Sequence, residues 1–264
     1  MKVIGIIPSR YGSTRFPGKP LADMMGKTMI RRVYERAIKA KMLDWLVVAT
    51  DDERIMHEVK NFGGRAVMTS PEHLNGTERC AEVAEQFNAE VVINVQGDEP
   101  FIDPAQIDLL ANLFKNNIEI ATLIKEQPLN EELQNPARVK VVVNKNMEAL
   151  YFSRSLIPFL RDHPHFSIHG FNANKNKALQ HELNGTAVKH IFYKHIGIYG
   201  YRKDVLRQIV KLAPSPLEEA ENLEQLRWLE NGYKIKCAVT DYDPVSIDTP
   251  DDLQVALKSV KKFK

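Results

Sequence analysis

A group of cations among small residues is the strongest chemical signal in this sequence. Arg10, Arg15 and Lys19 lie between Pro8 and Pro20, in a segment rich in glycine, serine and proline. Small residues let backbone N–H groups approach an anion closely, and spaced cations can then contact several phosphate oxygens. The Gly-Lys-Ser/Thr ending of a P-loop is absent. The segment therefore predicts a polyphosphate site of another kind, and the alternative is a solvated basic turn.

Two carboxylates could complement such a site. Asp98 belongs to the segment 96–100, which directly follows the apolar run 91–95, and Asp248 precedes Thr249-Pro250. Mg²⁺ prefers one or two carboxylates together with substrate phosphates, so the pair could hold this ion. Each aspartate also has a structural alternative, as a turn or helix-capping residue. Nothing in their spacing shows that the two side chains meet.

Two further segments could recognise the rest of a ligand. In 75–79, Arg79 could face a nucleotide base, or the segment could simply cap a helix. In 195–202, His195, Tyr199 and Tyr201 share one face of an extended strand because their spacing is even. With the Glu224-Gln225 pair they would suit a sugar and its hydroxyls, although a core strand explains them equally well.

The elements that must position these residues alternate along the first half of the chain. We expect buried strands at 3–7, 46–49, 66–68 and 91–95, and helices at 28–41, 52–59 and 77–87. This order predicts a parallel sheet with ligands at the carboxyl ends of its strands. The segments at those ends are the loop after Pro8, the turn at 50–52 and the turn at 96–100.

The second half is less regular. We expect strands at 138–143, 149–152 and 196–201, a helix at 217–229 and a final helix from Asp251. Residues 162–189 are polar and aperiodic, which indicates a long loop or lid, with a disordered insertion as the alternative. We expect one domain over 1–264, with its lid or insertion at 162–189.

Composition excludes several classes of protein. The net charge is +2, from 36 basic and 34 acidic residues, which gives no reason to expect a nucleic acid or an anionic membrane as partner. The two cysteines, Cys80 and Cys237, form no metal or disulfide pattern and fit a reducing cytosol. We find no signal peptide and no apolar run of about 20 residues that could span a bilayer. We therefore expect a soluble, cytoplasmic protein.

Taken together, these segments resemble the 3-deoxy-manno-octulosonate (Kdo) cytidylyltransferases, also called CMP-Kdo synthetases. The matching segments run in order through nearly the whole chain, at residues 6–21, 48–51, 76–79, 94–100, 151–154, 195–202, 223–227 and 248–250. The first segment and 195–202 are specific to the family. The resemblance implies a Rossmann-like α/β nucleotidyltransferase fold with a mainly parallel sheet and a smaller extension for sugar binding and dimerisation.

The resemblance also implies an activity: transfer of CMP from CTP to Kdo, giving CMP-Kdo and pyrophosphate, in a Mg²⁺-dependent homodimer that activates the sugar for lipopolysaccharide synthesis. The catalytic residues would be Arg10, Arg15, Lys19, Asp98 and Asp248, with both aspartates as metal ligands. Sugar ligands would be Arg154, His195, Tyr199, Tyr201, Glu224 and Gln225, with Arg154 on the carboxylate. CTP would contact Pro8, Arg10, Tyr11, Gly12, Ser13, Arg15, Lys19, Thr50, Asp51, Gly76, Thr77, Arg79, Gln96 and Gly97.

The chain departs from the family pattern at two places. Ser9 stands where we expect alanine, and 162–189 is longer than the usual connection, which leaves an 8-amino variant of Kdo open as the substrate. Three alternatives compete with the main interpretation. They are a sialic acid cytidylyltransferase, a hexose-1-phosphate nucleotidyltransferase, which would show a glycine-rich first loop, and a non-catalytic CTP-sensing module.

Overall fold

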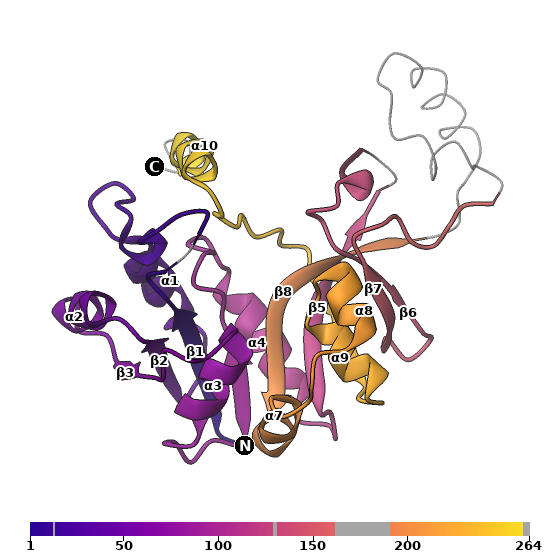
Figure 1. Ribbon diagram of the computed structural model, residues 1–264, viewed down its shortest axis with the longest axis horizontal. Coiled ribbons are helices and arrows are strands. Elements are labelled where there is room, and N and C mark those ends of the chain that lie inside the picture. Colours follow the sequence, from indigo (N-terminus) through magenta and orange to yellow (C-terminus); the bar gives the residue numbers. More distant parts are fainter. Residues whose placement is uncertain (13, 129–130, 162–190, 261–264) are drawn as a thin grey trace. The chain divides into compact units, whose positions relative to one another are not determined.

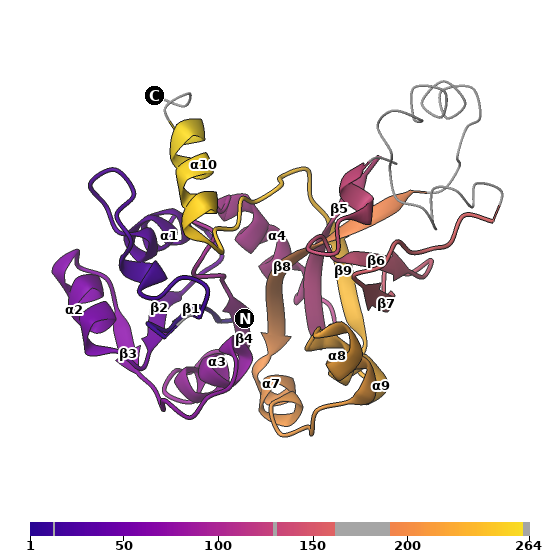
Figure 2. The same cartoon turned by 45° about the horizontal axis from the view of Figure 1, so that its top comes forward.

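The computed structural model describes residues 1–12, 14–128, 131–161 and 191–260 (Figures 1 and 2). The chain divides into two units. Unit 1 comprises Met1–Thr122, Gly197–Leu212 and Tyr242–Lys264, and unit 2 comprises Leu123–Ile196 and Ala213–Asp241. The predicted lid at 162–189 lies outside the described residues. The prediction of one domain over 1–264 stays a prediction.

Unit 1 is built on a parallel sheet. Strand β1 (Val3–Ser9) lies between β2 (Trp45–Thr50) and β4 (Val91–Asn94), and β3 (Ala66–Met68) pairs with β2. All three pairings are parallel, as the alternation of strands and helices predicts. The second half of β8 (Phe192–Arg202) runs antiparallel to β4 and makes the sheet mixed. β1 is almost wholly buried, which explains its continuous apolar sequence.

Helices follow the strands of unit 1, and side-chain caps fix where several of them begin. Thr28 accepts a hydrogen bond from the Arg31 N–H, Asp52 from the Arg54 N–H, and Asn75 from the Glu78 N–H. The predicted starts are therefore right to within a residue. The first and third of these helices end earlier than expected, at Ala37 and Ala84, and the second ends two residues later, at Asn61. The helices of unit 1 are α1 (Met29–Ala37), α2 (Glu53–Asn61), α3 (Gly76–Ala84), α4 (Pro104–Leu113), α7 (Lys203–Ile209) and α10 (Pro250–Val260), with a 3-10 turn at Lys19–Leu21.

Unit 2 contains the antiparallel strands β6 (Lys140–Val143) and β7 (Ala149–Ser153), the first half of β8, β9 (Ile235–Val239) and most of β5 (Ile120–Gln127). It also holds a 3-10 turn at Glu131–Gln134. Lys140 is fully buried and donates to the carbonyl oxygens of Asn135, Arg138 and Arg154. Burial lowers the pKa of Lys140 to about 8, and nearby Glu221 partly opposes that shift.

One predicted helix, 217–229, is wrong. The structure has two short helices there, α8 (Pro216–Glu221) and α9 (Gln225–Glu230). Asn222 lies between them in the left-handed conformation, with φ at 51°, and this ends the first helix. Strand β5, helix α7 and strand β9 are additional to the predicted elements, and β8 begins four residues earlier than expected.

Both cysteines are buried free thiols, and burial raises the pKa of Cys237 to about 12. Within the described residues, none of the helices combines the length and the apolar character needed to cross a bilayer.

Candidate active site

A cavity of about 360 Å³ opens in unit 1, beyond the carboxyl ends of β1 and β4. The loop after β1, the turn before α3, the turn after β4 and the turn before α10 all contribute to its wall. The residues that line it are Pro8, Ser9, Arg10, Arg15, Lys19, Pro20, His73, Leu74, Asn75, Gly76, Arg79, Gln96, Gly97, Asp98 and Asp248. Two of the three segments selected from the sequence therefore line one cavity.

Lys19 joins the two carboxylates at the cavity wall. Its ammonium nitrogen lies 2.8 Å from Asp98 Oδ2 and 3.3 Å from Asp248 Oδ1. The Arg15 guanidinium lies 3.1 Å from the same oxygen of Asp248. Asp98 and Asp248, which are 150 positions apart in the sequence, thus meet around one cation. The Lys19 side chain is only 14% exposed, so water screens this charge less than it would a surface lysine.

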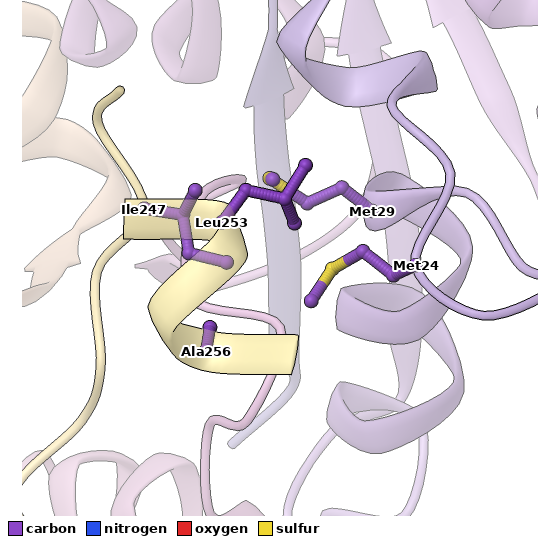
Figure 3. Close-up of a cluster of buried hydrophobic side chains, with 5 residues drawn as sticks. All are labelled: Met24, Met29, Ile247, Leu253 and Ala256. Carbon is purple, nitrogen blue, oxygen red and sulfur yellow. The ribbon is translucent and has the colours of Figure 1, made fainter. Parts of the chain in front are cut away.

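The position of Asp248 is fixed by its neighbours. The Ile247 side chain is fully buried in a cluster with Met24, Met29, Leu253 and Ala256. Figure 3 shows these side chains of α10 and its preceding turn facing Met24 and Met29. Met24 lies between Lys19 and α1, and Met29 is the first residue of α1. The cluster therefore ties Asp248 to the cationic loop.

Hydrogen bonds hold the start of α10 as well. Asp252 Oδ2 accepts hydrogen bonds from the backbone N–H groups of Asp248 and Thr249 and from the Thr249 hydroxyl. The hydrogen bond from the Thr249 side chain is the main reason that the pKa of Asp252 lies below its ordinary value. The turn that carries Asp248 is thus held by polar as well as apolar contacts.

The cationic loop itself is held by Tyr11. The guanidinium carbon of Arg54 lies 3.3 Å from the centroid of the Tyr11 ring, and Asp52 binds that guanidinium at 2.7 and 3.0 Å. The Gly18 N–H donates to the Tyr11 carbonyl oxygen. Gly18 has φ at 70°, and a Cβ there would lie 3.1 Å from the Tyr11 ring. Glycine at this position therefore lets the loop fold back on Tyr11.

Arg79 is buried and paired. Its guanidinium lies 2.8 Å from Asp51 Oδ2 and also donates to the Thr69 hydroxyl. The side chain is 3% exposed, although the residue lines the cavity. Asp51 therefore contacts Arg79, while the neighbouring Thr50 hydroxyl accepts a hydrogen bond from the Asp52 N–H. A role of Arg79 toward a base stays a prediction.

Glycine is needed where the turn after β4 approaches β1. A Cβ on Gly97 would lie 2.9 Å from the carbonyl oxygen of Pro8. The backbone after β4 can come this close to β1 only without a side chain. Of the predicted CTP ligands that the structure describes, Tyr11, Gly12, Thr50, Asp51 and Thr77 lie outside the cavity lining, and Ser13 is not among the described residues.

Five cavity residues belong to neither the predicted CTP site nor the predicted metal pair: Ser9, Pro20, His73, Leu74 and Asn75. His73 Nε2 is hydrogen-bonded to Glu82, whose carboxylate also accepts from the Ser70 N–H. Burial raises the pKa of the Glu82 carboxyl, but these two hydrogen bonds outweigh it and hold the pKa below its ordinary value. The signal that could have found His73 is its place in the turn that leads into α3.

Ser9 adds an unexpected polar group. Ser9 lines the cavity, and its hydroxyl is buried and has no hydrogen-bond partner among the described residues. An unpartnered buried hydroxyl costs free energy unless something satisfies it. Serine at this position therefore leaves a buried hydroxyl without a described partner in a residue that lines the cavity.

The predicted sugar ligands are divided between the units. Tyr199 and Tyr201 belong to unit 1, where their rings stack with centroids 6.0 Å apart, so the shared strand face is confirmed for this pair. Arg154, His195, Glu224 and Gln225 belong to unit 2. Their joint role in sugar binding stays a prediction.

Two of the residues in unit 2 have well-defined surroundings. The Arg154 guanidinium donates to the carbonyl oxygens of Pro136, Glu221 and Asn222, which indicates a structural role at the end of α8. His195 packs edge-on against Phe152, and burial lowers its pKa to about 3. The imidazole is therefore neutral at physiological pH and could exchange hydrogen bonds with a hydroxyl group.

Comparison with solved structures identifies the fold. Over 98% of its length the chain matches the crystal structure of a 4-diphosphocytidyl-2C-methyl-D-erythritol synthase from Anaerococcus prevotii, with a TM-score of 0.59 at 10% identity, and it covers 99% of that chain. The chain therefore has a Rossmann-like α/β fold, with cations and carboxylates gathered at the carboxyl ends of its strands.

Sequence similarity identifies the class of protein, a nucleotidyltransferase, and its family. The family model described as "Cytidylyltransferase" matches residues 4–235. A 3-deoxy-manno-octulosonate cytidylyltransferase from Parabacteroides distasonis is 50% identical, over 97% of each chain. A solved structure of CMP:2-keto-3-deoxy-manno-octonic acid synthetase complexed with CTP is 38% identical, has a TM-score of 0.86 and is covered completely, as is this chain. The chain belongs to the 3-deoxy-manno-octulosonate cytidylyltransferase family.

Proposed function

We propose that this protein transfers CMP from CTP to Kdo, giving CMP-Kdo and pyrophosphate. The observation that carries the proposal is the gathering of Arg10, Arg15 and Lys19 with Asp98 and Asp248 around one cavity. A polyphosphate needs spaced cations, and phosphoryl transfer depends mostly on positioning and charge neutralisation. The full-length similarity to the family supplies the choice of CTP and Kdo.

In the proposed reaction, the anomeric 2-hydroxyl oxygen of Kdo attacks the α-phosphorus of CTP. A new bond forms between that oxygen and the phosphorus, the bond from phosphorus to the oxygen bridging to the β-phosphate breaks, and pyrophosphate leaves. The hydroxyl proton passes to solvent. Arg15 and Lys19 would stabilise the negative charge that builds on the departing pyrophosphate. Among the described residues that line the cavity, we assign none as the general base.

The remaining nucleotide contacts follow from the lining of the cavity. Arg10 and the backbone of the 8–10 segment would hold phosphate oxygens, and Gln96, Gly76 and Arg79, which also line the cavity, would recognise the rest of the nucleotide. The Ser9 hydroxyl, buried without a partner among the described residues, supports a ligand contact at the base of the cationic loop. His73 is an additional candidate because its ring lines the cavity and is oriented by Glu82.

We propose Mg²⁺ as the cofactor, held by Asp98 and Asp248. The residues present fit this ion, because two carboxylates already converge on one cation and Mg²⁺ takes one or two carboxylates plus phosphate oxygens. When bound, the ion would polarise the α-phosphate and lower the pKa of the attacking hydroxyl. Described His, Cys, Asp and Glu residues form no group of three or more that could hold a metal by themselves, so substrate oxygens would complete the coordination.

We also propose, from family membership, that the protein works as a homodimer in the cytoplasm and supplies the activated sugar for lipopolysaccharide synthesis. Two buried free thiols are in keeping with a reducing compartment. Size-exclusion chromatography with light scattering tests the dimer directly.

The activity is tested by pyrophosphate release. CTP, ATP, GTP and UTP are each offered with Kdo and Mg²⁺, with and without EDTA. Release only with CTP, Kdo and metal is the expected result. Release with sialic acid or 8-amino-Kdo in place of Kdo would keep the reaction and change the substrate. If CTP binds but no acceptor leads to pyrophosphate release, the proposal is overturned in favour of a nucleotide-sensing module.

A further inference from the structure

Lys19 makes a contact that the proposed function does not require. A side chain that binds phosphate needs only to reach the phosphates of the nucleotide. The Lys19 ammonium nitrogen nevertheless lies within 3.3 Å of both proposed metal ligands, Asp98 and Asp248. The Lys19 and Asp98 side chains are 14% and 24% exposed, so their charges are only partly screened. An ammonium and a dication would therefore compete for the same oxygens.

Charge balance favours the same conclusion. With Lys19 and Arg15 in place, Asp98 and Asp248 belong to an electrically neutral group. A dication bound by the two carboxylates would give this group an excess of two positive charges. The attraction between the carboxylates and Lys19 would then fall, and the attraction of the whole group for a polyphosphate would rise.

We infer that Lys19 is an internal counter-ion, which occupies the two carboxylates in the nucleotide-free protein and makes binding of the free metal weak. The metal then enters mainly together with the nucleotide, whose phosphates offer Lys19 another partner. This inference rests on the proposed roles of Asp98 and Asp248. It adds a positioning and regulatory role for Lys19 that precedes any contact with substrate.

The test is metal binding without nucleotide. Mn²⁺ is titrated into the apoprotein and its free fraction is followed by electron paramagnetic resonance. Lys19→Met removes the charge but keeps the length of the side chain. It should bind Mn²⁺ more tightly than the wild type, on the order of tenfold or more, because a competing ligand has been removed. Lys19→Arg keeps the charge and should bind about as weakly as the wild type.

A second cation of the same cavity controls for general electrostatics. Arg10 lines the cavity, and no hydrogen bond or ion pair joins it to either aspartate in the part of the chain that the structure describes. Arg10→Met should therefore increase Mn²⁺ affinity far less than Lys19→Met. If the two variants gain equally, or if Lys19→Met gains nothing, the inference is overturned. No Mn²⁺ binding by any variant would overturn it as well.

Stability provides an independent measurement. In EDTA, Lys19→Met should melt at a lower temperature than the wild type, because Asp98 then loses its cation and only Arg15 remains to offset the two carboxylates. Added Mn²⁺ should restore more of the melting temperature in the variant than in the wild type. If Lys19→Met does not fold, Lys19→Gln replaces it in both the Mn²⁺ titration and the melting experiment. Pyrophosphate release by the wild type is measured separately, so that loss of the proposed activity and loss of the counter-ion role are distinguishable.

Discussion

The backbone N–H of Ile247 donates a hydrogen bond of 3.0 Å to the carbonyl oxygen of Asp98. The residue beside one proposed metal ligand is thereby bonded to the main chain of the other. Since the Ile247 side chain is also fully buried between α10 and the two methionines, apolar packing and the spacing of the carboxylates are linked.

Ile247→Ala should therefore weaken both stability and metal use. Truncation of a buried isoleucine costs about 2–5 kcal/mol of the free energy of unfolding. Because Asp248 would lose its anchor, we expect a several-fold rise in the Mg²⁺ concentration needed for half-maximal activity. Val255→Ala is the control, since Val255 lies on the following helix, α10, and is 63% exposed. A variant with lowered stability and an unchanged Mg²⁺ requirement would show that the cluster only supports the fold.

Asp98→Asn should nearly abolish turnover and leave the fold intact. An amide keeps the size of the side chain but not the charge that would hold a metal, and loss of such electrostatic stabilisation costs about 10²–10³ in rate. Asp103→Asn is the matched control, because Asp103 caps α4 and asparagine caps equally well. Pyrophosphate release and circular dichroism are the measurements. An Asp98→Asn variant that stayed active and Mg²⁺-responsive would contradict the metal-ligand assignment.

Arg54→Ala should loosen the cationic loop without touching the phosphates directly. It removes the cation over the Tyr11 ring, an interaction worth about 0.5–2 kcal/mol. We expect the KM for CTP to rise several-fold and kcat to change less. Lys60→Ala, an exposed change on the same helix, should leave both constants unaltered. Equal constants in all three proteins would mean that the loop holds its shape without Arg54.

His195 should make the protein less stable in acid. Burial lowers its pKa to about 3, whereas an unfolded histidine titrates near pH 6.5. As pH falls from 6.5 toward 3, the unfolded chain binds a proton that the folded chain does not, so stability falls with pH across this window. Between pH 7 and pH 5 the loss is about 2 kcal/mol.

Urea unfolding at the two pH values measures this effect. His195→Gln should show a smaller loss between pH 7 and pH 5, and His57→Gln, at an exposed position on α2, should behave as the wild type. Equal pH dependence in all three proteins would assign the acid sensitivity to other groups.

Much of unit 1 could be predicted from the sequence, because its signals are local. Apolar runs identify β1, β2, β3 and β4, and the caps at Thr28, Asp52 and Asn75 lie beside the helices they begin. Prediction from local patterns fails where helical composition and the backbone conformation of a single residue disagree. Residues 217–229 have helical composition, but the left-handed Asn222 divides them into two helices. A backbone conformation of this kind depends on contacts made after the chain has folded.

By itself, the sequence determined the cationic loop, the order of strands and helices in unit 1 and the family of the chain, because each is encoded in residue types and in spacings of a few positions. Only the tertiary structure decided that Asp98 and Asp248 share one lysine, that Arg79 is paired with Asp51, and that Tyr11 lies under Arg54. These pairs form between segments whose distance is set by the packing of the whole unit, and no local preference of either partner specifies the other.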